Sequence, residues 1–432
     1  MEKSFSELKT WTSKKFAAEV TKINCSSTAG ENFYRYMMGS KNLTTYFKMK
    51  YAITGLAIFL LFVLLKNAIS NNEEDKRWMS NNSENKNGML SSNEDNEDTP
   101  IDFKNNGLDK IKSAKGIVSI NEILQNIYEP YGYIAEHYEN DLFIKLQLKE
   151  KKTCHQIYAN WIDASKSDFK PSNDQQILLK DNFTLNGYST LTKCYFTDSF
   201  TSEQSSDKII QVSKNWTQHF IDKWIYQIKN GNNSQLQISQ YSDGVSLYYA
   251  TKYYNIVGKT GAVIGSIIPW VEAMCLANGA SKIVTIDYNY IEIGHKDIIF
   301  LNAFDFVKRK KFFDFVASFS SIEHSGLGRY NDPLDPIGDI REMQKISCML
   351  KPGGLFFLGI PVGQDDVGHN CHRTYGRIRL PMMFAGFELL NIFYMQSKPL
   401  DSSVDVFEDD HGGNPLNFTH FVFVLRNAKT VS

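Results

Sequence analysis

A turn in the C-terminal half of the chain has residues suited to binding a nucleoside. Gly265 and Ser266 follow a short apolar run, and Pro269, soon after them, suits the first turn of a helix. A glycine lets a ligand approach the backbone, and a helix N-terminus favours a carboxylate or phosphate. Asp287, 22 residues after Gly265, can accept hydrogen bonds from ribose hydroxyls. The pattern predicts a nucleoside ligand; the alternative is an ordinary turn at a strand end and an acid that caps a helix.

A second candidate is the pair Glu323-His324, which follows a predicted buried strand. His324 could act as a base towards a hydroxyl, because the unperturbed pKa of histidine is about 6.5. The alternative is a helix cap and a surface histidine. A short cluster of His369, Cys371 and His372 next to two aspartates could ligate a metal, but its spacing fits no standard site, so we expect no metal.

The elements that must position these residues alternate between strand and helix. Short apolar runs bounded by turn residues predict strands, and longer stretches with one apolar face predict helices. The predicted strands are 261–265, 282–287, 298–301, 313–318, 355–360, 387–395 and 418–425, and the predicted helices are 247–254, 269–278 and 336–350. This order predicts a Rossmann-like, doubly wound α/β domain with a mostly parallel seven-stranded sheet. We expect the last two strands to form an antiparallel edge pair.

Several stretches carry a resemblance to a known family. Residues 313–324, FDFVASFSSIEH, resemble the fourth-strand motif of class I S-adenosylmethionine-dependent methyltransferases. Residues 342–361, EMQKISCMLKPGGLFFLGIP, are similar to their helix, Lys-Pro-Gly-Gly turn and fifth strand, and 372–375 and 385–388 resemble the stretch after that strand. The likeness covers residues 245–428. The run SSIEHSGLGRYNDPLDPIGD also resembles an uncharacterised domain family expanded in Caenorhabditis nematodes.

The resemblance implies where S-adenosylmethionine would bind. In the family, a glycine-rich turn holds the methionyl part of this cofactor, an acid after the second strand holds its ribose, and residues after the third strand contact its adenine. The corresponding positions here are Gly261, Gly265, Ser266, Asp287 and Asp305. Glu323 and His324 correspond to the substrate side, which implies a catalytic role for both.

We therefore expect an S-adenosylmethionine-dependent methyltransferase that acts on an oxygen or nitrogen of an unknown small-molecule, glycan or protein acceptor. Ile267 and Pro269 replace two glycines of the family's turn. The alternative is thus an inactive, methyltransferase-like binding module. The near-balance of 47 Lys+Arg and 48 Asp+Glu argues against a dedicated nucleic-acid binder.

An uncharged apolar run over 51–65, YAITGLAIFLLFVLL, predicts a transmembrane signal anchor over 49–69. Residues 1–50 carry nine Lys or Arg and four Glu, so the positive-inside rule keeps the tail, 1–48, in the cytosol. We expect a single-pass type II protein of the endoplasmic reticulum or Golgi, with a lumenal C-terminal part. The alternatives are a buried core helix, or a signal peptide if translation begins at Met49.

Residues 70–115 read as a flexible stem, because few apolar side chains can be buried there. Residues 116–244 read as a mostly helical cap region, with helices over 121–138 and 207–229, before the α/β domain at 245–428. Anchor and stem are also typical of type II glycosyltransferases, a further alternative. The Asp-x-Asp metal motif that would support it is absent from the sequence.

Two further features agree with a lumenal location. Glycosylation sequons begin at Asn81, Asn182, Asn215, Asn232 and Asn417. In an oxidising lumen we expect Cys154 to pair with Cys194 in a disulfide.

Overall fold

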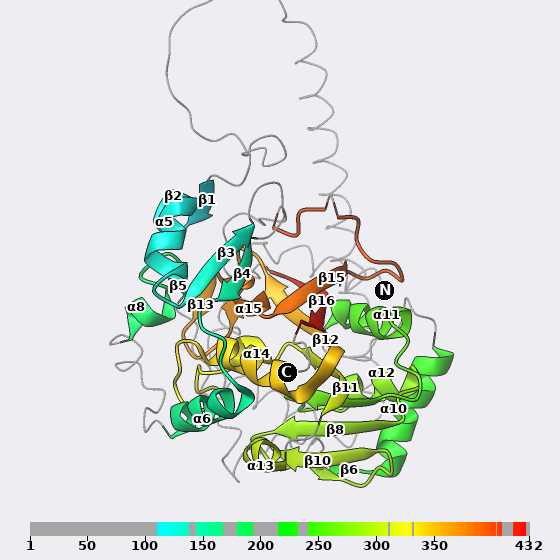
Figure 1. Ribbon diagram of the computed structural model, residues 1–432. Helices are drawn as coiled ribbons and strands as arrows, with labels where there is room; N and C mark the ends of the chain where they lie inside the picture. The colour runs from blue at the N-terminus through cyan, green and yellow to red at the C-terminus, as the bar shows by residue number, and fades with distance from the viewer. Residues whose placement is uncertain are drawn as a thin grey trace, which may run out of the picture. The chain divides into compact units, whose positions relative to one another are not determined.

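The computed structural model describes residues 110–137, 144–166, 179–192, 215–231, 241–309, 312–330, 332–402, 404–407 and 418–428 (Figure 1). All of them belong to one compact unit, Pro100–Ser432. The predicted anchor, 49–69, lies outside the described residues. Within the described ranges, no helix has both the length and the apolar character that a membrane crossing requires.

A seven-stranded sheet lies at the centre of this unit (Figure 1). Its strands are β7 (Thr260–Ile264), β8 (Lys282–Asp287), β10 (Ile298–Asn302), β11 (Phe313–Phe319), β12 (Leu350–Val362), β15 (Phe387–Phe393) and β16 (Thr419–Asn427). Their order across the sheet is β10-β8-β7-β11-β12-β16-β15. The first five are parallel, whereas β16 is antiparallel to both β12 and β15. The predicted doubly wound sheet and its antiparallel edge pair are confirmed.

The strand order reverses at β7, because β8 and β11 flank it on opposite sides. Successive side chains of β7 point to opposite faces, as in any strand. Ala262 and Ile264 join a core with α14 (Gly338–Met349) and α15 (Arg379–Phe384). Val263 joins a second core on the other face. Helices α10 (Gln218–Asn230), α11 (Val245–Tyr253) and α12 (Trp270–Ala277) contribute to that second core.

The region before the sheet mixes helices with short strands. In chain order its elements are β1 (Lys110–Ser113), β2 (Gly116–Ser119), α5 (Ile120–Ile123), the π-helical η1 (Leu124–Tyr128), β3 (Tyr133–His137), β4 (Lys145–Leu148), α6 (Cys154–Ser165), α8 (Lys180–Phe183), β5 (Thr190–Thr192) and β6 (Asn215–Trp216). β1 and β2 form an antiparallel hairpin, so the predicted stem ends in ordered structure.

Two expected helices in this region are corrected. The helix expected over 121–138 ends near Tyr128, because Pro130 lacks an N–H and Gly132 turns the chain at a φ of +81° before β3 begins. The helix expected over 207–229 starts only at Gln218 in its described part. Thr217 caps it by accepting from the Phe220 N–H, as an N-cap does.

The disulfide expected between Cys154 and Cys194 is also corrected, because Cys154 is bonded to Cys348. Helix α6 packs along α14, which brings the first residue of α6 beside the last turn of α14. The two Cα atoms lie 5.6 Å apart, across 194 residues of sequence. A bond across so long a loop strongly restricts the unfolded chain.

The disulfide predicts a large loss of stability when it is removed. The double substitution Cys154→Ala and Cys348→Ala is expected to lower the free energy of unfolding by about 3–5 kcal/mol, because the closed loop is long. Urea unfolding of the purified chain without reductant measures this. Cys275→Ala is the control, since Cys275 is buried and free. Equal stability of the two variants would contradict the prediction.

Candidate functional site

The carboxyl ends of β7 and β11 meet where the strand order reverses, the place where doubly wound sheets bind ligands. Gly265 and Ser321 approach each other there. Gly265 has a φ of +65°, and a Cβ atom at this position would overlap Ser321 Oγ. Ser320 also adopts a left-handed conformation, with a φ of 48°. Such backbone conformations in non-glycine residues often occur at functional sites.

Asp287, the last residue of β8, is oriented by backbone N–H groups beside this turn. The Asn289 N–H donates to Asp287 Oδ1 (2.7 Å), and the Ser266 N–H donates to Oδ2 (3.4 Å). Burial raises the pKa of Asp287, while these hydrogen bonds oppose the rise. Its side chain remains partly exposed. The Asn289 side-chain amide also donates to Oδ1 (3.3 Å). A carboxylate has about four acceptor positions, so Asp287 can still accept one hydrogen bond from a ligand hydroxyl.

Glu272, in the first turn of α12, supports the turn from inside and was not predicted. Its carboxylate accepts from Ser266 Oγ (3.1 Å) and from Thr285 Oγ1 (2.9 Å), and it is fully buried. Burial raises the pKa of Glu272 to about 7, although the hydrogen bonds oppose the rise. The signal for this residue in the sequence was a single acid in an otherwise apolar helix.

Glu323 and His324 lie in η4 (Ile322–His324), directly after Ser321, and both are buried. His324 Nδ1 lies 2.5 Å from the Cys371 carbonyl oxygen, so it donates there. His324 Nε2 lies 3.6 Å from Glu323 Oε1. Burial and the nearby Arg329 guanidinium hold the pKa of His324 well below 6.5, so the ring is neutral. The surface histidine considered as the alternative is therefore wrong.

The remaining predicted site residues lie elsewhere. Gly261 is inside β7, where a Cβ atom would overlap the Phe315 ring, so packing within the sheet requires this glycine. Asp305 is exposed on α13 (Ala303–Arg309) and pairs with Lys308 at 3.3 Å. The structure thus brings together the Gly265-Ser266 turn, Asp287 and, through Ser321, the Glu323-His324 pair.

The stretch around His369, Cys371 and His372 serves other contacts. Asp365 accepts from three backbone N–H groups, those of Gly376, Ile378 and Arg379. Cys371 is disulfide-bonded. Across the part of the chain that the structure describes, no group of three or more His, Cys, Asp or Glu side chains could hold a metal ion.

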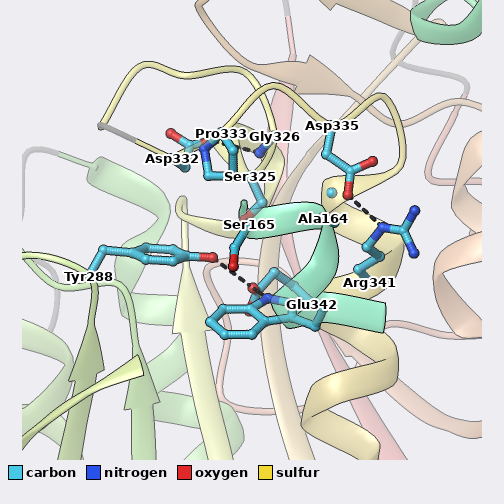
Figure 2. A pocket seen from close by; sticks show the side chains of 12 residues that line it. Ala164, Ser165, Tyr288, Ser325, Gly326, Asp332, Pro333, Asp335, Arg341 and Glu342 are labelled. Carbon is cyan, nitrogen blue, oxygen red and sulfur yellow. Dashed lines mark hydrogen bonds and ion pairs between the residues drawn. The ribbon is translucent and has the colours of Figure 1, made fainter. Parts of the chain in front are cut away.

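A shallow pocket opens beside Tyr288, the residue after Asp287 (Figure 2). Trp161 of α6 stacks on Tyr288 and donates its Nε1–H to Glu342 Oε1 (2.7 Å). The Tyr288 hydroxyl points to the same oxygen, and Lys345 pairs with Glu342 at 2.7 Å. With a cavity volume of about 20 Å³, this pocket holds roughly one water molecule and is far smaller than the roughly 300–1,000 Å³ usual for ligand sites. No local pattern in the sequence indicates that α6 reaches this position.

Two buried arginines hold the loop that follows His324. Arg379 donates twice to Asp339, at 2.7 and 2.8 Å, and Arg373 Nε lies 3.7 Å from the same carboxylate. Burial alone would raise the pKa of Asp339, but the two guanidinium groups outweigh it and lower the pKa. Arg373 also donates to the carbonyls of Glu323 (3.3 Å) and Ser325 (2.6 Å). The backbone of the Glu323-His324 segment is thereby fixed.

Comparison with known proteins agrees with the fold. Residues 258–428 match a family described as "Caenorhabditis protein of unknown function, DUF268". A search of the curated proteins found no match. The domain has an α/β fold with a large mixed sheet.

Three solved structures are similar to part of this chain. The N-methyltransferase NodS of Bradyrhizobium japonicum, with S-adenosylhomocysteine bound, is 12% identical over 48% of this chain and 98% of its own, with a TM-score of 0.31. A Burkholderia thailandensis 1,6-didemethyltoxoflavin-N1-methyltransferase is 11% identical over 49% and 91%, with a TM-score of 0.31. A proposed methyltransferase of Streptococcus mutans is 13% identical over 43%, with a TM-score of 0.28, and the match spans only 49% of that protein. At these values the matches carry no argument about activity.

The buried Glu272 predicts a pH dependence of stability. Its pKa is about 7 in the folded chain against 4.5 as the ordinary value, so the native state binds the extra proton. The stability that this group contributes is fully present below pH 4.5 and is lost as the pH rises through 7. Between pH 5 and 8 the wild type should therefore lose up to about 3 kcal/mol more than Glu272→Gln.

Urea unfolding at several pH values measures this difference. Glu292→Gln, at an exposed position of β9 (Glu292–Ile293), is the control and should follow the wild type. Parallel pH profiles for wild type and Glu272→Gln would show that the carboxyl is not the titrating group.

Proposed function

We propose that the chain is an S-adenosylmethionine-dependent methyltransferase that binds its donor at the carboxyl ends of β7, β8 and β11. The observation that carries this proposal is Asp287, which lies at the end of β8, is oriented by backbone N–H groups and is still able to accept hydrogen bonds. When bound, S-adenosylmethionine would supply an electrophilic methyl group. Asp287 would hold the ribose hydroxyls, and the Gly265-Ser266 turn would lie beside them.

The residues fit the nucleoside half of this donor better than its methionyl half. Tyr288 and Phe304, which follow β8 and β10, pack edge to face at 5.8 Å and place an aromatic cluster beside Asp287, in which Trp161 already stacks on Tyr288. Beside Gly265, however, Ser321 Oγ already fills the space into which a Cβ would point. This contact, with the bulky Ile267 and Pro269, favours a second candidate: a methyltransferase-like module that binds a nucleoside without transferring a methyl group.

Removing the Asp287 carboxylate tests the donor site. Calorimetric titration of the wild type with S-adenosylmethionine and S-adenosylhomocysteine should give micromolar affinity. Asp287→Ala should weaken it about 10- to 100-fold, because a hydrogen bond to a charged group contributes roughly 1.5–3 kcal/mol. Asp297→Ala is the control, since Asp297 pairs with Lys282 on the surface. Absence of binding by folded wild type would refute the proposal, and sugar nucleotides would be titrated next.

We further propose that this unit lies on the lumenal side of an endoplasmic reticulum or Golgi membrane, held by the expected anchor at 49–69. The Cys154–Cys348 disulfide supports an oxidising compartment, because such bonds are rare in the cytosol. Asn182 and Asn215, which begin two of the sequons, are exposed.

A lumenal location predicts N-linked glycans on the chain. Expressed in eukaryotic cells, the full chain should migrate faster after treatment with an amidase that removes N-glycans. Asn182→Gln should lower the apparent mass by one glycan, whereas Thr184→Ser, which keeps the sequon, should not. An unmodified chain, with all five sequons that follow the expected anchor unoccupied, would contradict the lumenal location.

A further inference from the structure

His420 lies at the same edge of the sheet as the proposed donor site. It is the second residue of β16 and pairs in register with Pro361, near the carboxyl end of β12. Its ring stacks on Phe319, the last residue of β11, at 5.3 Å, and contacts Tyr241 at 5.1 Å. Tyr241 in turn accepts from Ser320 Oγ (2.9 Å), beside the Gly265–Ser321 contact. Tyr241 and Ser320 therefore lie between His420 and the turn.

A carboxylate lies beside this ring. His420 Nδ1 lies 3.3 Å from Asp243 Oδ2, and the His420 backbone N–H donates to the same oxygen at 3.2 Å. An ionised carboxylate only accepts, so in the neutral ring Nδ1 carries the proton and Nε2 keeps its lone pair. Among the described residues, no hydrogen bond is made to His420 Nε2.

His324 has a cation as well as a carboxylate beside it, because Arg329 lies nearby and Glu323 Oε1 lies 3.6 Å from His324 Nε2. Its Nδ1–H is given to the Cys371 carbonyl, and protonation of Nε2 would place a second cation beside Arg329, which already lowers the pKa of His324. A proton taken up by His420 would instead lie beside Asp243. The other titratable groups near His420 are Glu323, His324, His372 and Tyr241.

Glu323 supplies a second negative group to this cluster. Burial raises the pKa of Glu323, while the neighbouring His420, a hydrogen bond from Ser320 and the Arg329 guanidinium oppose the rise. Glu323 is 1% exposed, and its Oε2 has no hydrogen-bond partner among the described residues. A buried carboxylate oxygen without a partner is costly, which suggests that a ligand group completes it.

We infer that His420, oriented by Asp243, accepts the proton of the methyl acceptor, and that Glu323 Oε2 hydrogen-bonds the same acceptor. This inference rests on the proposed function and replaces His324 as the base. The acceptor oxygen or nitrogen would form a bond to the methyl carbon while the carbon–sulfur bond breaks with its electron pair going to sulfur. The acceptor proton would pass to His420 Nε2, so the class of acceptor is a neutral hydroxyl or amine with at least one hydrogen.

Nitrogen-15 spectra of the histidine side chains test the orientation without knowing the acceptor. The full chain contains nine histidines, which single substitutions can assign. Near neutral pH, His420 should show the tautomer with the proton on Nδ1, and Asp243→Ala should reduce that preference. A proton fixed on Nε2 would overturn the inference, because no lone pair would then face the acceptor. Asp222→Ala, which removes the 3.4 Å partner of His295, is the matched control and should leave the His420 signal unchanged.

Adding S-adenosylhomocysteine to the same sample tests the location. Calorimetry first establishes whether this probe binds. With the probe bound, the His420 and His324 signals should shift, while that of His295 should not. Binding of the probe without a shift of the His420 signal would refute this inference but not the proposed function. No binding to folded protein would refute the proposed function, and the inference with it.

Discussion

The described structure depends on one buried carboxylate shared by two arginines. Asp339, Arg373 and Arg379 are all at most 1% exposed, so none of the three charges is solvated by bulk water. Burying a charge is costly unless it is paired, which makes each member necessary for the other two. Because Arg373 also binds the carbonyls of Glu323 and Ser325, this cluster ties α14 and α15 to the end of β11. Ser321, which approaches Gly265, lies directly before that segment.

The two sides of the site differ in their chemical surroundings. On the β8 side, Asp287 is bound by backbone N–H groups and remains partly exposed, as a ligand-binding acid requires. On the β11 and β16 side, Glu323, His324 and His420 are buried among aromatic rings, where water screens charges poorly. A polar nucleoside suits the first environment, and a proton transfer between paired groups suits the second.

The sheet could be predicted from the sequence because its signals are local. Runs such as KIVTID, with β-branched residues and a terminal acid, correspond residue for residue to β8. Residues of the candidate site could be predicted only when they lie at the end of a strand or shortly after it, as Ser266, Asp287 and Glu323 do. Trp161 and His420 reach the site through tertiary packing from distant segments, and no local pattern marks them. The prediction that Cys154 pairs with Cys194 was wrong for the same reason, because no local pattern in either helix indicates that α6 packs on α14.

That disulfide has a consequence for the order of events during synthesis. Cys154 leaves the ribosome 194 residues before Cys348, a delay of roughly 10–40 s at the usual 5–20 residues per second. Cys194 is synthesised much sooner than Cys348. The Cys154 thiol can therefore meet Cys194 before α14 has been synthesised. A Cys154–Cys194 bond formed in that interval would have to be replaced by thiol–disulfide exchange once α14 has formed, and maturation would then depend on that exchange.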